Sequence, residues 1–174
     1  MKFSVIYADP PWKFGGTGGT KWSSASSYYR CLSDSELMKL NIKKIAEDDC
    51  ILFCWITAAH LKEGILVCEA WGFKYITIGF VWYKERANVG NYTMPQCEFC
   101  LIFKRGKIPK DRVRNPGIKS FFSGKIGRHS EKPDEIRQRI AKMFPTSKKV
   151  ELFARERHSD WRVYGDQVKA DVKL

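Results

Sequence analysis

The sequence predicts an α/β fold in which a mostly parallel β-sheet carries helices on both faces. Two observations indicate this class. Short apolar runs of strand length alternate with stretches of helical hydrophobic spacing, and the runs are nearly continuous in apolar residues, as in strands buried on both sides. The chain has 174 residues, 44% of them hydrophobic, which suffices for one core and is short for two. We therefore expect a single domain over residues 1–174.

The first predicted strand covers residues 3–7 and leads directly into Asp9-Pro10-Pro11-Trp12. The two prolines end the strand because neither can donate a ladder hydrogen bond. Asp9 thus follows the carboxyl end of a strand, the edge at which ligands bind in open α/β sheets.

These four residues fit the activation of an aromatic amine, such as the 6-amino group of adenine, whose lone pair is delocalised. Asp9 and the Pro10 carbonyl are two acceptors for the amine hydrogens. Pro10 and Pro11 stiffen the turn, and Trp12 offers a flat face on which a base can stack. The alternative is an ordinary proline-rich turn with a core tryptophan.

The next stretch is a long glycine- and serine-rich segment, followed by a helix. The segment contains Trp22, Tyr28 and Tyr29, which are candidate stacking surfaces on a lid over the target base; a disordered surface loop is the alternative. A capping box at residues 33–36 then predicts a helix that continues to about Ala46.

Alternating elements continue through the middle of the chain. Residues 50–56 form an apolar run of strand length, residues 59–71 have helical spacing with Gly72 as the stop, and residues 75–82 predict a third strand. Turn-forming residues make 84–96 a loop, and 97–103 predicts another strand with Glu98 near its start.

The net charge of +12 favours a polyanionic partner, for which nucleic acid is the natural candidate. Basic residues concentrate in residues 104–128, which have too many glycines, prolines and charges for a regular element. We interpret the segment as a phosphate-contacting loop that includes Lys125 and Arg128, supported by the aromatic pair 121–122; a solvated loop is the alternative.

The last elements are a helix and a strand. Helical spacing of Ile136, Ile140 and residues 143–144 follows Pro133, which suits the first helical turn. Lys132 stands just before it, where it can bind a carboxylate. Residues 149–153 predict a buried strand, so Arg155 should face the ligand crevice.

Six cysteines invite a metal count, and Cys97 and Cys100 have C-x-x-C spacing. The other candidates, Cys50 and Cys54, lie in a predicted strand that has no turn to bend round an ion, so we expect buried reduced thiols and no metal. The sequence has no long apolar run and no signal pattern, from which we expect a soluble, cytoplasmic protein without a membrane partner.

The motif Asp9-Pro10-Pro11-Trp12 after a strand resembles that of the MT-A-type N(6)-adenine methyltransferases. Three later stretches, at residues 129–135, 149–155 and 160–165, resemble that family in the same order. The resemblance implies a Rossmann-like methyltransferase with circularly permuted motif order, S-adenosylmethionine as cofactor, and Asp9-Pro10-Pro11-Trp12 as catalytic residues. It also implies that the cofactor is bound by Asp9, Lys132, Arg155, His158, Asp166 and Gln167. Two of these depart from the family pattern, since His158 and Asp166 each stand where the family has an asparagine.

The resemblance also implies that Glu98 lies by the target adenine. From their composition and charge, we expect the loops 13–31, 84–96 and 104–128 to meet the substrate. We expect methyl transfer to the N(6) amine of adenine, in DNA because the chain resembles the small prokaryotic and phage members. RNA methylation is the nearest alternative. A catalytically silent nucleic-acid-binding subunit is disfavoured by the intact motif, and a small-molecule methyltransferase leaves the +12 charge unused. A homo- or hetero-oligomer is possible.

Overall fold

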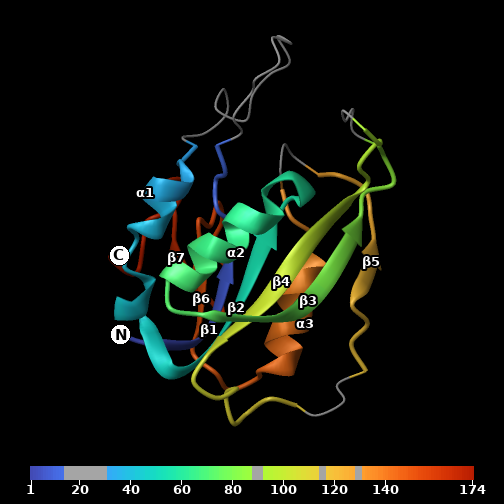
Figure 1. Cartoon of the computed structure of the whole chain (residues 1–174). Helices are drawn as coiled ribbons and strands as arrows, with labels where there is room; N and C mark the ends of the chain where they lie inside the picture. The colour runs from blue at the N-terminus through green and yellow to red at the C-terminus, as the bar shows by residue number, and fades with distance from the viewer. Residues whose placement is uncertain (14–30, 88–91, 114–116, 128–130) are drawn as a thin grey trace.

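A computed structural model describes residues 1–13, 31–87, 92–113, 117–127 and 131–174. Within this part of the chain, seven strands form one sheet, with three helices and two 3₁₀ turns around it (Figure 1). The strands are β1 Phe3–Ala8, β2 Ala46–Ile56, β3 Lys74–Tyr83, β4 Cys97–Arg105, β5 Phe121–Ser123, β6 Lys149–Leu152 and β7 Arg162–Tyr164. The helices are α1 Asp34–Met38, α2 Leu61–Ala70 and α3 Asp134–Met143, and the 3₁₀ turns are η2 Ile42–Lys44 and η3 Ala58–His60.

The sheet is mostly parallel, as predicted. Its strand order is β5-β3-β4-β2-β1-β6-β7, and β4 runs antiparallel to both of its neighbours while the other pairs are parallel. The amino end of β4 therefore lies at the same edge of the sheet as the carboxyl ends of the other strands. We call this the catalytic edge, because the expected catalytic residue Asp9 directly follows β1 there, and we call the opposite edge the basal edge.

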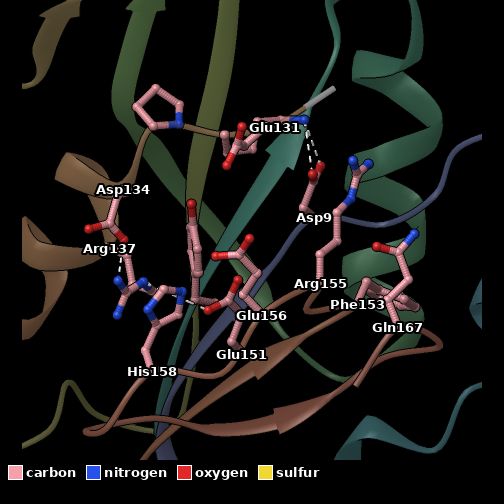
Figure 2. Close-up of a pocket in the computed structure, with 13 residues that line it drawn as sticks. Asp9, Glu131, Asp134, Arg137, Glu151, Phe153, Arg155, Glu156, His158 and Gln167 are labelled. Carbon is pink, nitrogen blue, oxygen red and sulfur yellow. Dashed lines mark hydrogen bonds and ion pairs between the residues drawn. The ribbon is translucent and has the colours of Figure 1, made fainter. Parts of the chain in front are cut away.

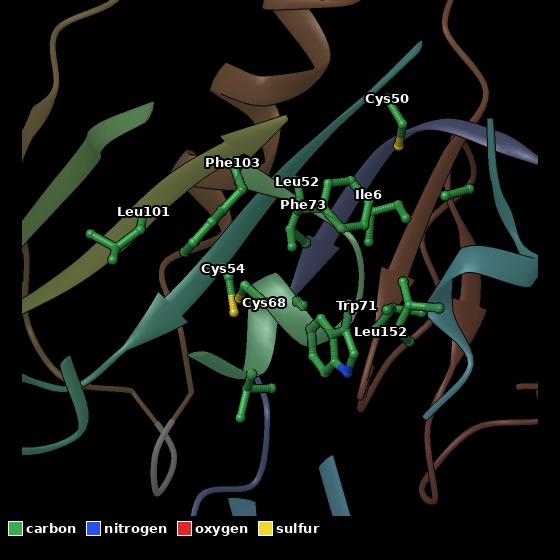
Figure 3. Packing of buried hydrophobic residues seen from close by; sticks show 14 of the residues in the cluster. Ile6, Cys50, Leu52, Cys54, Cys68, Trp71, Phe73, Leu101, Phe103 and Leu152 are labelled. Carbon is green, nitrogen blue, oxygen red and sulfur yellow. The ribbon is translucent and has the colours of Figure 1, made fainter. Parts of the chain in front are cut away.

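Helices cover both faces, which confirms the predicted layering (Figure 1). On one face Leu37 of α1 and Val67 of α2 join a core that contains Ile6 and Leu152, and part of this packing is visible in Figure 3. On the other face Ile136 and Ile140 of α3 and Phe144, which caps its end, pack against β1, β2 and β3. The central strands are thus buried on both faces of the sheet, which explains why their sequences are apolar at nearly every position.

The helix predicted from the capping box to Ala46 is wrong in its length. The box at Ser33 is present, with reciprocal bonds to Glu36, but α1 ends at Met38. Ile42–Lys44 forms a separate 3₁₀ turn, and Ala46 already pairs with Phe3 in the sheet. Sheet pairing therefore overrides the helical spacing of the apolar residues in this stretch.

Two strands were not predicted. β5 lies inside the basic stretch that we expected to lack regular structure. It forms because its residues pair with Val81–Tyr83, and Gly124 O, next to the strand, accepts a hydrogen bond from Trp82 Nε1 at 2.9 Å. β7 pairs with β6 and extends the far side of the sheet. Both are three residues long, so neither shows a periodic pattern that a sequence window can detect.

The basic stretch after β4 does not begin at the catalytic edge. Because β4 is antiparallel, Arg105 lies at the basal edge, where Gly106 turns the chain with φ of +61°. A β-carbon on Gly106 would overlap the carbonyl oxygen of Asp48. The chain returns to the catalytic edge only through β5, so the stretch spans the height of the sheet.

Candidate active site

The carboxyl ends of β1 and β6 and the beginning of α3 enclose a cavity of about 380 Å³ (Figure 2). It is lined by Tyr7, Asp9, Glu131, Lys132, Pro133, Asp134, Arg137, Glu151, Phe153, Arg155, Glu156, His158 and Gln167. A smaller cavity of about 50 Å³ adjoins it and is lined by Asp9, Pro10, Pro11, Phe153, Ala154, Arg155, Asp166 and Gln167. Asp9, Phe153, Arg155 and Gln167 belong to both, so the two cavities meet at these side chains.

An alternating chain of charges crosses the catalytic edge. Lys132 Nζ lies 2.9 Å from Asp9 Oδ1 and 3.4 Å from Glu98 Oε2, and Lys84 Nζ lies 2.9 Å from Glu98 Oε1. The side chains of Lys132 and Lys84 are 9% and 7% exposed. Four segments of the chain therefore meet through two lysines and two carboxylates that balance one another.

Burial and pairing set the ionisation of this cluster. Burial raises the pKa of Asp9, and Lys132 opposes that rise. Burial also acts to raise the pKa of Glu98, but the two lysines outweigh it and the pKa is lowered. For Lys132, burial acts to lower the pKa, whereas Asp9 and Glu98 raise it above the usual value. The lysine is therefore held charged beside the motif carboxylate.

Glu151 on β6 is a buried carboxylate with an unused acceptor. Among the described residues, its Oε2 has no hydrogen-bond partner, and Arg137 Nε lies 3.9 Å away. Burial, more than the neighbouring carboxylates, raises the pKa of Glu151 to about 7. A buried acceptor without a donor is costly, and this one belongs to a residue that lines the larger cavity.

The motif Asp9-Pro10-Pro11-Trp12 is held by hydrogen bonds on both sides. The Pro10 carbonyl accepts from Trp12 N at 2.9 Å, and the Pro11 carbonyl accepts from Leu32 N at 2.8 Å. A carbonyl oxygen has two lone pairs, so Pro10 keeps one for a further donor. The pairing with Leu32 brings the two ends of the segment 13–31 together beside the motif.

Trp12 is a core residue in this structure and not an open stacking surface. It is 4% exposed, its Nε1 donates to the Trp55 carbonyl at 3.1 Å, and its ring stacks on His60 at 5.7 Å between centroids. It lines neither cavity. The indole thus anchors the motif to β2, which is the alternative that the sequence left open.

The end of β6 is shaped by a strained residue and a close approach. Phe153, predicted as the last strand residue, lies just beyond β6 with φ of +62°, a conformation rare for residues other than glycine. Gly165 packs so closely on the Ala154 backbone that a β-carbon would overlap the Ala154 carbonyl oxygen. Together these features direct Arg155 toward both cavities.

Most of the predicted site residues come together. Asp9, Lys132, Arg155, His158 and Gln167 line the larger cavity, and Asp166 lines the smaller one with Pro10 and Pro11. Glu98 reaches the cluster through Lys132. Lys125 is exposed after β5 and lines neither cavity. Tyr28, Tyr29, Arg128 and the candidate lid residue Trp22 lie outside the described residues.

The sequence reasoning missed several residues of the cavities and of the charged cluster, among them Lys84, Arg137 and Glu151. Lys84 directly follows β3, in a segment that gave no sign of an ion pair, and Arg137 is one of several charges on α3. Glu151 had a visible signal, since it is a charged residue inside a predicted buried strand. Pro133, expected in the first helical turn, is instead the N-cap of α3 with extended backbone.

The larger cavity is acidic although the protein is basic. Five carboxyl groups line it, from Asp9, Glu131, Asp134, Glu151 and Glu156, against three cations, from Lys132, Arg137 and Arg155. Glu151, with a pKa of about 7, carries only part of its charge at neutral pH, so the other four still outnumber the cations. The whole chain carries a net charge of +12. The cavity is therefore suited to a ligand that carries positive charge together with one anionic group, which Lys132 can pair.

The cysteines and the helices add two further findings. Cys50, Cys54, Cys68 and Cys100 are buried free thiols, and burial raises the pKa of Cys100 well above its usual value. Among the described residues, no helix combines the length and the apolar character needed to cross a membrane.

Comparison with known proteins identifies relatives over almost the whole chain. The chain is 43% identical to the "Type II methyltransferase M.MunI" of Mycoplasma sp, a match that covers 96% of this chain and 78% of that protein. It is 28% identical to the human "N(6)-adenosine-methyltransferase catalytic subunit METTL3" and 26% identical to the "N(6)-adenosine-methyltransferase MT-A70-like" of Arabidopsis thaliana. The matches cover 96% and 95% of this chain but span only 28% and 24% of those two proteins.

The family model MT-A70 matches residues 3–167, which contain every strand of the sheet and both cavities. The matched region begins with β1 and the Asp9 motif and ends at Gln167, so it includes the alternating charges at the catalytic edge. The chain therefore belongs to the MT-A70 family of methyltransferases.

Proposed function

We propose that this protein transfers a methyl group from S-adenosylmethionine to the exocyclic N(6) amine of adenine in DNA. The observation that carries the proposal is the position of Asp9, whose carboxylate lines both the larger and the smaller cavity. A carboxylate at this junction can face a cofactor on one side and a target amine on the other.

The larger cavity fits the cofactor chemically. Its volume of about 380 Å³ lies in the range of small-molecule sites. Lys132 would pair with the cofactor carboxylate, and the surplus of acidic side chains would favour its ammonium and sulfonium charges. The unused Glu151 acceptor would take a ribose hydroxyl. Arg155, His158, Asp166 and Gln167 would complete the nucleoside end.

When bound, S-adenosylmethionine supplies the electrophilic methyl group. Asp9 and the second lone pair of the Pro10 carbonyl would accept the two hydrogens of the adenine amine, which raises electron density on its nitrogen. The backbone bonds that fix Pro10 and Pro11 keep these acceptors aimed, and proximity supplies much of the acceleration. Glu98 would hold the base, and in duplex DNA the target adenine must leave the stack.

DNA is favoured as the substrate by the similarity to a type II methyltransferase at 43% identity, against 28% for the human N(6)-adenosine-methyltransferase catalytic subunit. RNA remains the second candidate because the chain also resembles N(6)-adenosine methyltransferases. The intact Asp9 motif argues against a catalytically silent subunit. An enzyme of this kind would act in the cytoplasm of a prokaryotic or phage-infected cell, alone or as a homo- or hetero-oligomer.

The experiment supplies labelled S-adenosylmethionine with unmethylated bacterial DNA or with RNA transcribed from it, followed by digestion and separation of nucleosides. We expect label in N(6)-methyldeoxyadenosine. Label confined to N(6)-methyladenosine from RNA would replace DNA by RNA. Absence of label in both, with S-adenosylhomocysteine binding shown by calorimetry, would contradict the proposal in favour of a silent subunit.

A further inference from the structure

Exposed basic side chains gather at the basal edge, far from the cavities. β4 carries the chain from Glu98 to Lys104, which is six residues or about 20 Å of strand. Residues 106–113 then run below the sheet in Figure 1. We define the basal ridge as the exposed Lys74, Lys107, Lys110, Arg112 and Lys142 together with the half-buried Lys104.

The segment that carries the ridge has a fixed shape. Lys107 N donates to Asp49 Oδ1 at 2.8 Å, which ties the first turn to the beginning of β2. Asp111 accepts hydrogen bonds from Thr146 N at 3.1 Å and from Ser147 Oγ at 2.6 Å, which ties the segment to the loop after α3. Acidic side chains thus hold the segment in place, while its basic side chains project into solvent on a preorganised support.

The ridge also contains a like-charge pair that weakens the sheet. Lys74 on β3 pairs directly with Lys104 on β4, and like charges at opposed positions of neighbouring strands repel. Val113 N donates to Met143 O at 2.9 Å and so brings the segment beside Lys142 in the last turn of α3. Binding of a polyanion would relieve this repulsion.

Protection of a sheet edge does not explain the whole ridge. Lysines on exposed edge strands prevent unwanted strand pairing, and Lys74 can serve in that way. Lys107, Lys110 and Arg112 are not in a strand and protect no edge. Their charges need another explanation. A phosphate backbone is a ligand that several cations at a fixed spacing can bind together.

We propose that the basal ridge binds phosphates of duplex DNA that flanks the target adenine. This inference rests on the proposed function, since it takes DNA as the substrate, but it concerns a surface about 20 Å from Glu98 along β4. At about 3.4 Å of duplex per base pair, the ridge would contact DNA roughly six or more base pairs from the target. The enzyme would thereby hold the duplex along the α3 face as well as at the cavities.

The test compares a ridge variant with a matched control. The ridge variant is Lys107→Ala/Lys110→Ala/Arg112→Ala, and the control is Lys39→Ala/Lys62→Ala/Lys173→Ala, which also removes three exposed charges. Fluorescence anisotropy measures binding to pools of random-sequence duplex of about 10 and about 30 base pairs between 50 and 200 mM salt. Methyl transfer to unmethylated bacterial DNA is measured in parallel.

We expect the ridge variant to bind the long duplex more weakly, with a salt slope smaller by about 2.7 than that of the wild type, if each cation contacts one phosphate. When the salt concentration rises fourfold, the wild type should therefore lose about 40-fold more of its DNA affinity than the ridge variant loses. The short duplex should be affected much less, and the control should follow the wild type on both pools.

Two results would overturn the inference. One is an unchanged salt slope in the ridge variant. The other is a loss of DNA affinity in the ridge variant that equals the loss in the control variant, or that is the same for the short and the long duplex. A larger effect on RNA of the same length than on DNA would overturn the assignment to duplex DNA. A wild-type protein that binds DNA through the ridge but methylates no adenine would instead contradict the proposed function.

Discussion

Lys132 Nζ lies 2.9 Å and 3.0 Å from the two carboxylate oxygens of Asp9. The lysine thereby covers the group that we expect to accept the target amine, and it also pairs with Glu98. A cofactor carboxylate would compete with Asp9 for this cation. The ion pair thus connects the proposed cofactor site and the proposed base site through one side chain.

The two lysines of the cluster should differ in function while sharing a structural role. Lys132→Met removes the lysine that pairs with both Asp9 and Glu98, so it should lower the free energy of unfolding by about 3 kcal/mol in urea titrations. Lys84→Met leaves Glu98 paired with Lys132, so it should lower the free energy of unfolding by less. Lys132→Met should also lower S-adenosylhomocysteine affinity by about ten- to a hundredfold, measured by calorimetry. An equal affinity loss in Lys84→Met would contradict the assignment of Lys132 to the cofactor.

Glu151 should make the free energy of unfolding decrease as pH rises. Its folded pKa is about 7 against an ordinary 4.5, so the folded protein holds a proton that the unfolded chain releases between these values. The wild-type free energy of unfolding should therefore lose this contribution as pH rises from about 4.5 to about 7. Glu151→Gln escapes the loss and should gain roughly 2–3 kcal/mol over the wild type above pH 7. A difference between the two proteins that is constant with pH would contradict this.

The Trp12→Phe variant distinguishes a role of Trp12 in anchoring the motif from a role as a stacking surface for the base. Phenylalanine keeps an aromatic face but cannot donate to the Trp55 carbonyl, which loses a buried hydrogen bond worth about 1 kcal/mol. We expect a lower melting temperature and a lower kcat, with little change in KM for DNA. Unchanged stability and kcat would show that the indole nitrogen does not hold the motif.

Gly165→Ala should damage the site through sterics alone. The added β-carbon would overlap the Ala154 carbonyl oxygen, so we expect a loss of about 1–3 kcal/mol and weaker cofactor binding. Gly117→Ala is the matched control. Gly117 has φ of +66° with open space around it, so it should cost only about 1 kcal/mol of backbone strain and leave cofactor binding unchanged. Equal cofactor affinities in the two variants would contradict the role of Gly165.

Local rules predicted the parts of the site that depend on one strand end. Asp9 and Arg155 were placed correctly because each follows a buried apolar run that ends at the catalytic edge. Glu98 came from the family resemblance, and Lys132 came from its position just before a helix as well as from the resemblance; the structure joins them in one cluster. The partner Lys84 was out of reach, since an ion pair between two strands depends on their register.

Other features depend on topology that a sequence window does not contain. The basic stretch after β4 was interpreted as one substrate loop, but the antiparallel direction of β4 sends its first part to the basal edge. The apolar spacing before Ala46 fits a helix equally well until the pairing of Ala46 with Phe3 is known. β5 depends on the edge that β3 offers it, and its three residues, although two are phenylalanines, are too few for a sequence window to identify a strand.

The most direct measurement of the central claim is methyl transfer to DNA by Asp9→Asn, with S-adenosylhomocysteine affinity measured on the same preparation. Asparagine keeps the size of the side chain but removes the charge that faces both cavities. We expect methyl transfer to fall about a hundredfold or more, while cofactor affinity changes less than about tenfold and the protein stays folded by circular dichroism. Near wild-type methyl transfer by Asp9→Asn would contradict the claim that this carboxylate activates the adenine amine.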